Sequence, residues 1–224
     1  FFHAQRTGGS ALRHAFARAY GGCAVFSTQY AENYQHWDKV PAEDLNGKRV
    51  FAGHSNFSRR AMGRKLHFIS LLRHPLYRTI SLYYYCRKYP KHALHSVAME
   101  NTLSGFYEKA STARPKYFNN VMCARICGET SARSAIKLIE SEYMAIGMTE
   151  YLGSFVDWLL TKQDLPSEIT PQAKPDHEKY IKEIEDEEFV RVVMKQNAED
   201  VALFEHMNAN YFHVDERLYP SSRV

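Results

Sequence analysis

The sequence predicts an α/β fold with a central, mainly parallel sheet flanked by helices. Short apolar runs that suit buried strands alternate along the chain with amphipathic segments that suit helices. Polar and basic residues follow several of the apolar runs directly, at the strand ends where parallel sheets bind ligands. The 224 residues, 45% of them hydrophobic, are enough for one well-buried core, so we expect a single domain over residues 1–224.

The first part of the chain predicts four strands and two longer helices. An apolar run at 66–72 is typical of a buried parallel strand, and Pro75 ends it because proline lacks the donor that a strand ladder needs. The expected strands are 1–4, 23–27, 49–53 and 66–72, and the expected helices are 11–20 and 76–87, with a helical turn at 57–63.

The second part predicts one further strand and several helices. Residues 90–115 have no clear period, and we expect one or two irregular helices there that cover the site. Gly128 suits the end of a helix, because glycine readily takes the left-handed conformation. The remaining predictions are helices at 117–128, 131–141, 151–162, 178–194 and 197–210, a strand at 143–147 and a polar loop at 165–176.

The opening segment has the features of a phosphate cradle between a strand and a helix. Arg6 supplies a positive charge, and the Thr7-Gly8-Gly9-Ser10-Ala11 backbone can approach an anion at the start of the following helix. The loop is not the usual nucleoside-triphosphate loop, because its basic residue precedes the glycines. A strand-to-helix turn with no ligand would use glycine and a capping serine as well.

A second anion site is predicted at Arg73 and Ser81, after the strand at 66–72. The arginine ends the strand and the serine falls early in the next helix, eight positions later. Two anion sites on one sheet indicate a nucleotide with two separated phosphate groups. Arg73 paired with a carboxylate and Ser81 as an ordinary helix residue is the competing interpretation.

Composition excludes several other classes of protein. The net charge of +4 and the basic segments at 59–65 and 87–91 favour anionic ligands, yet no nucleic-acid-binding motif is present. The four cysteines are scattered as buried thiols would be, and neither they nor the eleven histidines have metal-binding spacing. No stretch reaches the roughly 20 apolar residues of a membrane span. Because residue 1 already falls in a predicted strand, we expect a chain trimmed at its N-terminus, which leaves a preceding anchor or targeting segment open.

These motifs resemble the sulfotransferases that use 3′-phosphoadenosine 5′-phosphosulfate (PAPS). The segment Arg6-Thr7-Gly8-Gly9-Ser10 is similar to that family's phosphosulfate loop, and Arg73 with Ser81 is similar to its 3′-phosphate motif. The segment Gly53-His54-Ser55-Asn56-Phe57 is similar to one of the heparan and uronyl 2-O-sulfotransferase branch. Further similar segments are Asn119-Asn120 with Arg125 and Gly128, and Ile146 to Glu150. Gln5 and Arg6 replace the usual Pro-Lys.

The resemblance implies a P-loop-like fold and in-line transfer of a sulfuryl group from PAPS, without a metal, to a hydroxyl, leaving adenosine 3′,5′-bisphosphate (PAP). Arg6 would stabilise the leaving oxygen beside Thr7–Ala11, Arg73 and Ser81 would hold the 3′-phosphate, and His54 would be the base. The implied acceptor is a glycan or another anionic molecule. A tyrosyl-protein or small alcohol acceptor, a non-catalytic PAPS- or glycan-binding module and a phosphoryl-transfer enzyme are alternatives. For the location of the protein in the cell, the bacterial cytoplasm and the Golgi lumen both stay open.

Overall fold

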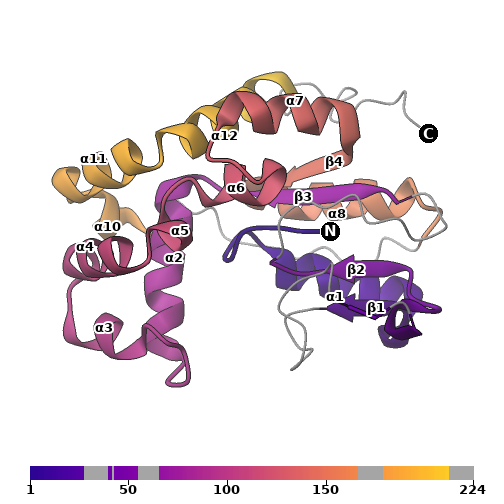
Figure 1. The fold of residues 1–224 in the computed structure, drawn as a ribbon, viewed down its shortest axis with the longest axis horizontal. Helices are drawn as coiled ribbons and strands as arrows, with labels where there is room; N and C mark the ends of the chain where they lie inside the picture. Colours follow the sequence, from indigo (N-terminus) through magenta and orange to yellow (C-terminus); the bar gives the residue numbers. More distant parts are fainter. Residues whose placement is uncertain (28–39, 42, 55–65, 166–178, 212–224) are drawn as a thin grey trace.

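The protein has an α/β architecture of parallel strands covered by helices (Figure 1). The computed structural model describes residues 1–27, 40–41, 43–54, 66–165 and 179–211. The helical turn predicted at 57–63 and nearly all of the loop predicted at 165–176 lie outside these residues. None of the helices in the described ranges is long and apolar enough to cross a membrane.

The strands run parallel in two pairs, and the start of the chain lies between them. Strand β1 (Val25–Ser27) pairs with β2 (Val50–Ala52), and β3 (Phe68–Leu72) pairs with β4 (Tyr143–Met148). Phe2 forms a parallel bridge with Gly53, and its carbonyl accepts a 2.7 Å hydrogen bond from the Ser70 hydroxyl. The predicted strand 1–4 is thus reduced to one bridge, and a side chain makes its link toward β3. Carboxyl ends of these parallel segments face the same way.

Helices cover both faces of the β3–β4 pair. On one face, Ile69, Leu71 and Ala145 pack with α1 (Gly9–Tyr20) and α8 (Leu152–Thr161). On the other, Leu72 and Ile146 pack with α6 (Val121–Cys127), α7 (Ala132–Glu142) and α12 (Ala198–Tyr211). This alternation is the period of two expected for a strand that is buried on both sides.

A second helical body extends from the end of β3. Helix α2 (Pro75–Lys88) leaves the sheet and packs with α3 (His95–Glu100), α4 (Leu103–Ala113) and α11 (Glu187–Gln196), as Figure 1 shows. The two helices in 90–115 confirm the expected helical segment; that this segment covers the site stays a prediction. The core of this body includes Ile80, Phe106, Phe118 and Phe189, all of which are buried.

The helix predicted over 117–128 is wrong, because the chain breaks at Asn120. The structure has α5 (Pro115–Phe118) and α6 instead. Asn120 takes a left-handed conformation (φ 49°), and its side-chain oxygen accepts the backbone N–H groups of Glu199 and Asp200 at 3.1 Å. In return, the Asp200 carboxylate accepts the N–H groups of Met122 and Cys123. The starts of α6 and α12 therefore cap each other.

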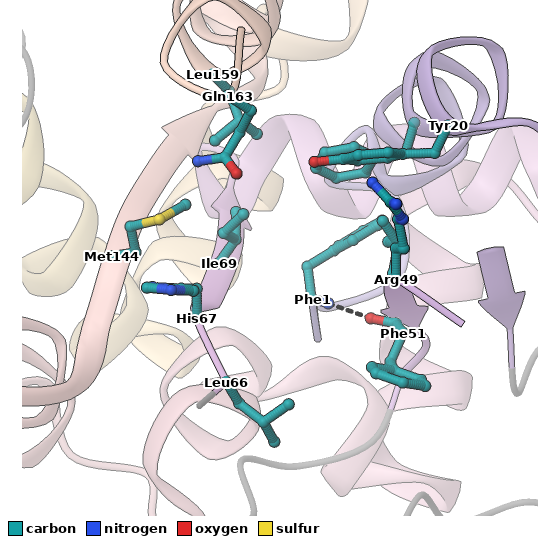
Figure 2. A pocket seen from close by; sticks show the side chains of 12 residues that line it. Phe1, Tyr20, Arg49, Phe51, Leu66, His67, Ile69, Met144, Leu159 and Gln163 are labelled. Atoms are coloured by element: carbon teal, nitrogen blue, oxygen red, sulfur yellow. Dashed lines mark hydrogen bonds between the residues drawn. The ribbon is translucent and has the colours of Figure 1, made fainter. Parts of the chain in front are cut away.

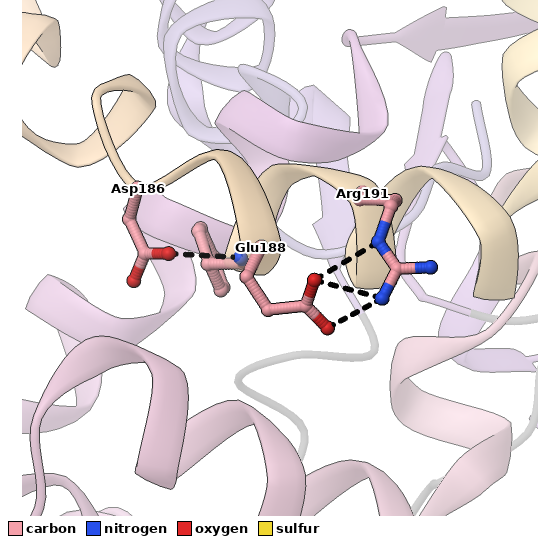
Figure 3. A network of polar contacts seen from close by, with 4 residues as sticks. Asp186, Glu188 and Arg191 are labelled. Carbon is pink, nitrogen blue, oxygen red and sulfur yellow. Dashed lines mark hydrogen bonds and ion pairs between the residues drawn. The ribbon is translucent and has the colours of Figure 1, made fainter.

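The helix predicted over 178–194 is also divided, into α10 (Ile181–Ile184) and α11. Asp186 caps α11 by accepting the Phe189 N–H at 3.0 Å, and Glu188 pairs with Arg191 along the same helix (Figure 3). Both partners of that ion pair are exposed, so it contributes little to stability.

Smaller differences concern one strand and the thiols. The strand predicted at 23–27 starts with a 3₁₀ turn, η1 (Gly22–Ala24), and short 3₁₀ turns η3 (Glu43–Leu45) and η4 (Thr149–Tyr151) follow. The prediction of buried thiols holds for Cys86 and Cys123, whereas Cys23 is exposed and Cys127 half-buried; all four are free.

Candidate functional site

The predicted site residues gather where parallel segments of the sheet end. Arg6 follows the N-terminal segment, His54 follows β2 and Arg73 follows β3. Contacts link them in a continuous series from His54 through the loop to Ser81, which lies on α2. Residues separated by up to 75 positions in the chain therefore form one polar site at the end of the sheet where open α/β proteins bind ligands.

The loop from Thr7 to Gly9 is shaped by hydrogen bonds to backbone carbonyl groups. The buried Thr7 hydroxyl donates to the Ala4 carbonyl at 2.9 Å, so this side chain holds the turn closed. Gly8 has φ 90°, and α1 begins at the next residue without a side-chain cap. The Ala11 and Leu12 amides both bond to the Gly8 carbonyl. An uncapped helix start of this kind carries a partial positive charge that favours anions.

Arg6 turns its side chain toward Ser81 and α2. Its Nε donates to the Ser81 hydroxyl at 3.1 Å, and its guanidinium carbon lies 4.6 Å from the centre of the Tyr85 ring. Arg6 has φ 70°, a left-handed conformation that is uncommon outside glycine and costs about 1–3 kcal/mol. Burial and the neighbouring charge of Arg73 lower the Arg6 pKa.

Arg73 holds the backbone of Arg6 in this conformation. Its Nη1 donates to the Arg6 carbonyl at 2.9 Å, and both Arg73 and Ser81 are buried. The Arg73 guanidinium also lies 5.9 Å from the centre of the Tyr180 ring. The adjacent carboxylate of Glu150 accepts the His74 N–H at 3.2 Å, which fixes the start of α2. The predicted pair Arg73 and Ser81 thus meets around Arg6.

His54 is oriented by the carbonyl of His3. The distance between His54 Nδ1 and that oxygen is 3.1 Å. Since a carbonyl only accepts, Nδ1 carries the proton and Nε2 keeps its lone pair. Burial lowers the His54 pKa, an effect opposed by the His3 hydrogen bond and reinforced by Arg125. His54 is therefore neutral at physiological pH and able to accept a proton.

His3 is a site residue that the sequence interpretation missed. Its ring packs edge to face with His54, with centroids 4.6 Å apart, and its Nδ1 lies 2.8 Å from the Ala4 carbonyl. A Cβ on Gly9 would lie only 1.9 Å from this ring. Burial, followed by the neighbouring His54, holds the His3 pKa well below its usual range. The only available signal in the sequence was a histidine within the first predicted strand, five positions before the glycine pair.

Four other residues of these motifs lie on the helices α1, α2 and α6. Arg78, not singled out from the sequence, is completely buried and donates to the Phe118 carbonyl at 2.9 Å, which makes it a structural anchor for α5. Arg125 lies on α6, and its charge acts on both His3 and His54. Ser10 is exposed on α1, next to the half-buried Ala11.

A pocket of about 180 Å³ with apolar and polar lining residues lies at the opposite end of the sheet (Figure 2). Its lining includes residues near the starts of strands, namely Phe1, Val50, His67, Ile69 and Met144. The Phe1 amine donates to the Phe51 carbonyl beside it. None of the predicted anion-binding residues lines this pocket, so it is separate from the polar site.

No protein-family model and no curated protein matches this chain. Its function is therefore inferred from its own residues and from the motifs that they form.

Proposed function

We propose that the protein is a PAPS-dependent O-sulfotransferase with a P-loop-like nucleotide-binding fold. The observation that supports this most strongly is the meeting of Arg6, Arg73 and Ser81 next to the glycine loop. Two guanidinium groups and a hydroxyl beside an uncapped helix start form a polar surface suited to phosphate oxygens. Such a surface fits a nucleotide that carries phosphate at two positions.

The reaction would be an in-line displacement at sulfur. The acceptor oxygen forms a bond to sulfur while the bond from sulfur to the 5′-phosphate oxygen breaks, and PAP leaves with an added negative charge. Positive charge and aligned amide dipoles that are already in place stabilise that charge without reorganisation. At this site the Gly8–Ser10 backbone supplies the amide dipoles, and the motif resemblance assigns the positive charge to Arg6.

His54 would take the proton from the acceptor hydroxyl. Its Nε2 is the nitrogen with the free lone pair, because Nδ1 donates to the His3 carbonyl. A neutral imidazole is required for this step, and burial of His54 lowers its pKa and favours that form. A positioned base of this type contributes about 10²- to 10⁴-fold to a rate.

The acceptor that best fits the chain is an anionic carbohydrate. Arg87, Lys88 and Lys91, at and just after the end of α2, are exposed, and so is the ring of Tyr89. Charged groups bind carboxylates or sulfates, and an aromatic ring packs against the apolar face of a sugar. No nucleic-acid partner is proposed.

A second candidate is a binding module that holds PAPS or an anionic glycan without transferring sulfate. Arg6, in place of the family's lysine, favours it, because the guanidinium contacts Ser81 and keeps its proton. A phosphoryl-transfer enzyme ranks lower, because the sequence has no recognisable Walker-type magnesium ligand.

The test is release of PAP from PAPS in the presence of a panel of sulfated and unsulfated glycans, without added metal. We expect turnover in the wild type and a loss of about 10²-fold or more in His54→Ala, with PAP affinity within about threefold of wild type. His14→Ala, at an exposed histidine on α1, is the matched control. Unchanged turnover in His54→Ala would remove His54 from the base role, and PAP binding without any turnover would favour the binding module.

A further inference from the structure

We infer that Arg6 binds the 3′-phosphate of the nucleotide together with Arg73 and Ser81, so that both arginines bind the same phosphate group. This inference rests on the proposed function, and it changes the role expected for Arg6. The position of Arg6 in the sequence suggested contact with the 5′-phosphosulfate, whereas its side chain meets the residues of the other subsite.

The direction of the Arg6 side chain is set by three contacts. Nε donates to Ser81 Oγ at 3.1 Å, the guanidinium stacks over Tyr85, and the Arg6 carbonyl is held by Arg73 at 2.9 Å. Tyr85 and Ser81 are one turn apart on α2 and therefore lie on the same side of that helix. Arg73 fixes the uncommon backbone conformation of Arg6, and in this conformation the Arg6 side chain points toward α2.

The charges around Arg6 favour a doubly charged anion. The charged neighbour that most strongly affects Arg6 is Arg73, which repels it. A phosphate monoester carries about −1.5 to −2 charges at pH 7 and three acceptor oxygens, so it can bridge two guanidinium groups and a hydroxyl. The bridging phosphate of the 5′ group carries a single charge and is a weaker match.

The start of α1 would then bind the 5′-phosphosulfate. Gly8 takes the positive φ that the turn needs, Ser10 is exposed there, and no side chain caps the helix. Backbone amides and the helix dipole would hold this group without a full positive charge. Arg6 would accordingly determine which nucleotides bind, rather than how well any 5′-phosphate binds.

The experiment compares three ligands by calorimetry: PAP, adenosine 3′-monophosphate and adenosine 5′-monophosphate. For Arg6→Ala we expect affinity for PAP and the 3′-monophosphate to fall at least about 30-fold, the scale of losing one charged partner. Affinity for the 5′-monophosphate should stay within about threefold. Arg18→Ala, at an exposed arginine in the last turn of α1, is the matched control and should leave all three affinities within that range.

Two results would overturn the inference while leaving the proposed nucleotide site intact. They are an equal loss of affinity for both monophosphates and a loss confined to the 5′-monophosphate. If wild-type protein binds none of the three ligands, the proposed function fails and the inference fails with it. Circular dichroism checks folding, and if Arg6→Ala does not fold, Arg6→Lys takes its place. Arg6→Lys keeps the charge but lacks the Nε donor, so the inference requires preferential weakening of the two 3′-phosphorylated ligands.

Discussion

The site end of the sheet and the junction of α6 with α12 both bury polar and charged groups, but they satisfy them differently. At the junction, the buried Asp200 carboxylate accepts two backbone N–H groups, and Asn120 returns two bonds to the start of α12. At the site end, Arg6 and Arg73 place two positive charges together, and Arg6 has a left-handed backbone.

This difference separates a structural network from the candidate site. Polar groups that cap each other rigidify a core, because the buried acceptors and the backbone donors that they bind satisfy each other. Like charges and backbone strain persist only where the surrounding structure holds them, and they are typical of functional sites. Helix α6, which the junction fixes, also supplies the Met122 sulfur that contacts the Arg73 N–H at 3.5 Å. The satisfied region thus supports the strained one.

The largest expected effect comes from breaking the junction with Asp200→Ala. This change removes the acceptor for two buried N–H groups and the carboxylate that interacts with the buried Arg78, so we expect a loss of about 3 kcal/mol in the free energy of unfolding. Urea denaturation measures it, with Glu188→Ala, at an exposed carboxylate, as the control. A loss below 1 kcal/mol would show that the junction is not the structural support described.

A smaller effect is expected from crowding the loop with Gly9→Ala. The new Cβ would lie 1.9 Å from the His3 ring, and overpacking of this kind costs about 1–3 kcal/mol. Thermal and urea unfolding measure stability, and PAP titration measures the site. Gly22→Ala is the matched control, because a Cβ there meets nothing within 4 Å. His3→Ala should partly rescue Gly9→Ala; additive losses would contradict the contact.

The smallest effect is a dependence of stability on pH. Burial lowers the pKa of His3 in the folded protein, whereas in the unfolded chain it titrates near 6.5. The unfolded state therefore binds more protons as the pH falls below about 6.5, and stability is lost by up to about 1.4 kcal/mol per pH unit. His3→Asn should have a shallower dependence between pH 6.5 and 5. Parallel curves for the two proteins would show that His3 titrates normally.

Much of the fold was predictable because it depends on local patterns. The apolar run ending at Leu72, followed by Pro75, predicted β3 and α2, and their observed bounds agree within two residues. The break at Asn120 was not predictable, because its bonding partners lie about 80 positions away on α12.

The site was predictable in its members but not in its contacts. The spacing of Arg73 and Ser81 singled out two residues that meet around Arg6, and the glycines singled out the loop at the start of α1. The turn of Arg6 toward Ser81 depends on a backbone conformation that Arg73 holds from 67 positions away, and no local pattern encodes it. His3 was missed because its role follows from packing against Gly9 and His54 in three dimensions.

The most direct test of the proposed nucleotide site is calorimetric titration of PAP into the wild type and into Arg73→Ala. The proposal predicts 1:1 binding by the wild type, weakened at least about 30-fold in the variant, since truncating a buried charged partner costs 2 kcal/mol or more. Well-folded wild-type protein that binds no PAP, or a variant that binds it equally well, would contradict a nucleotide site at Arg6, Arg73 and Ser81.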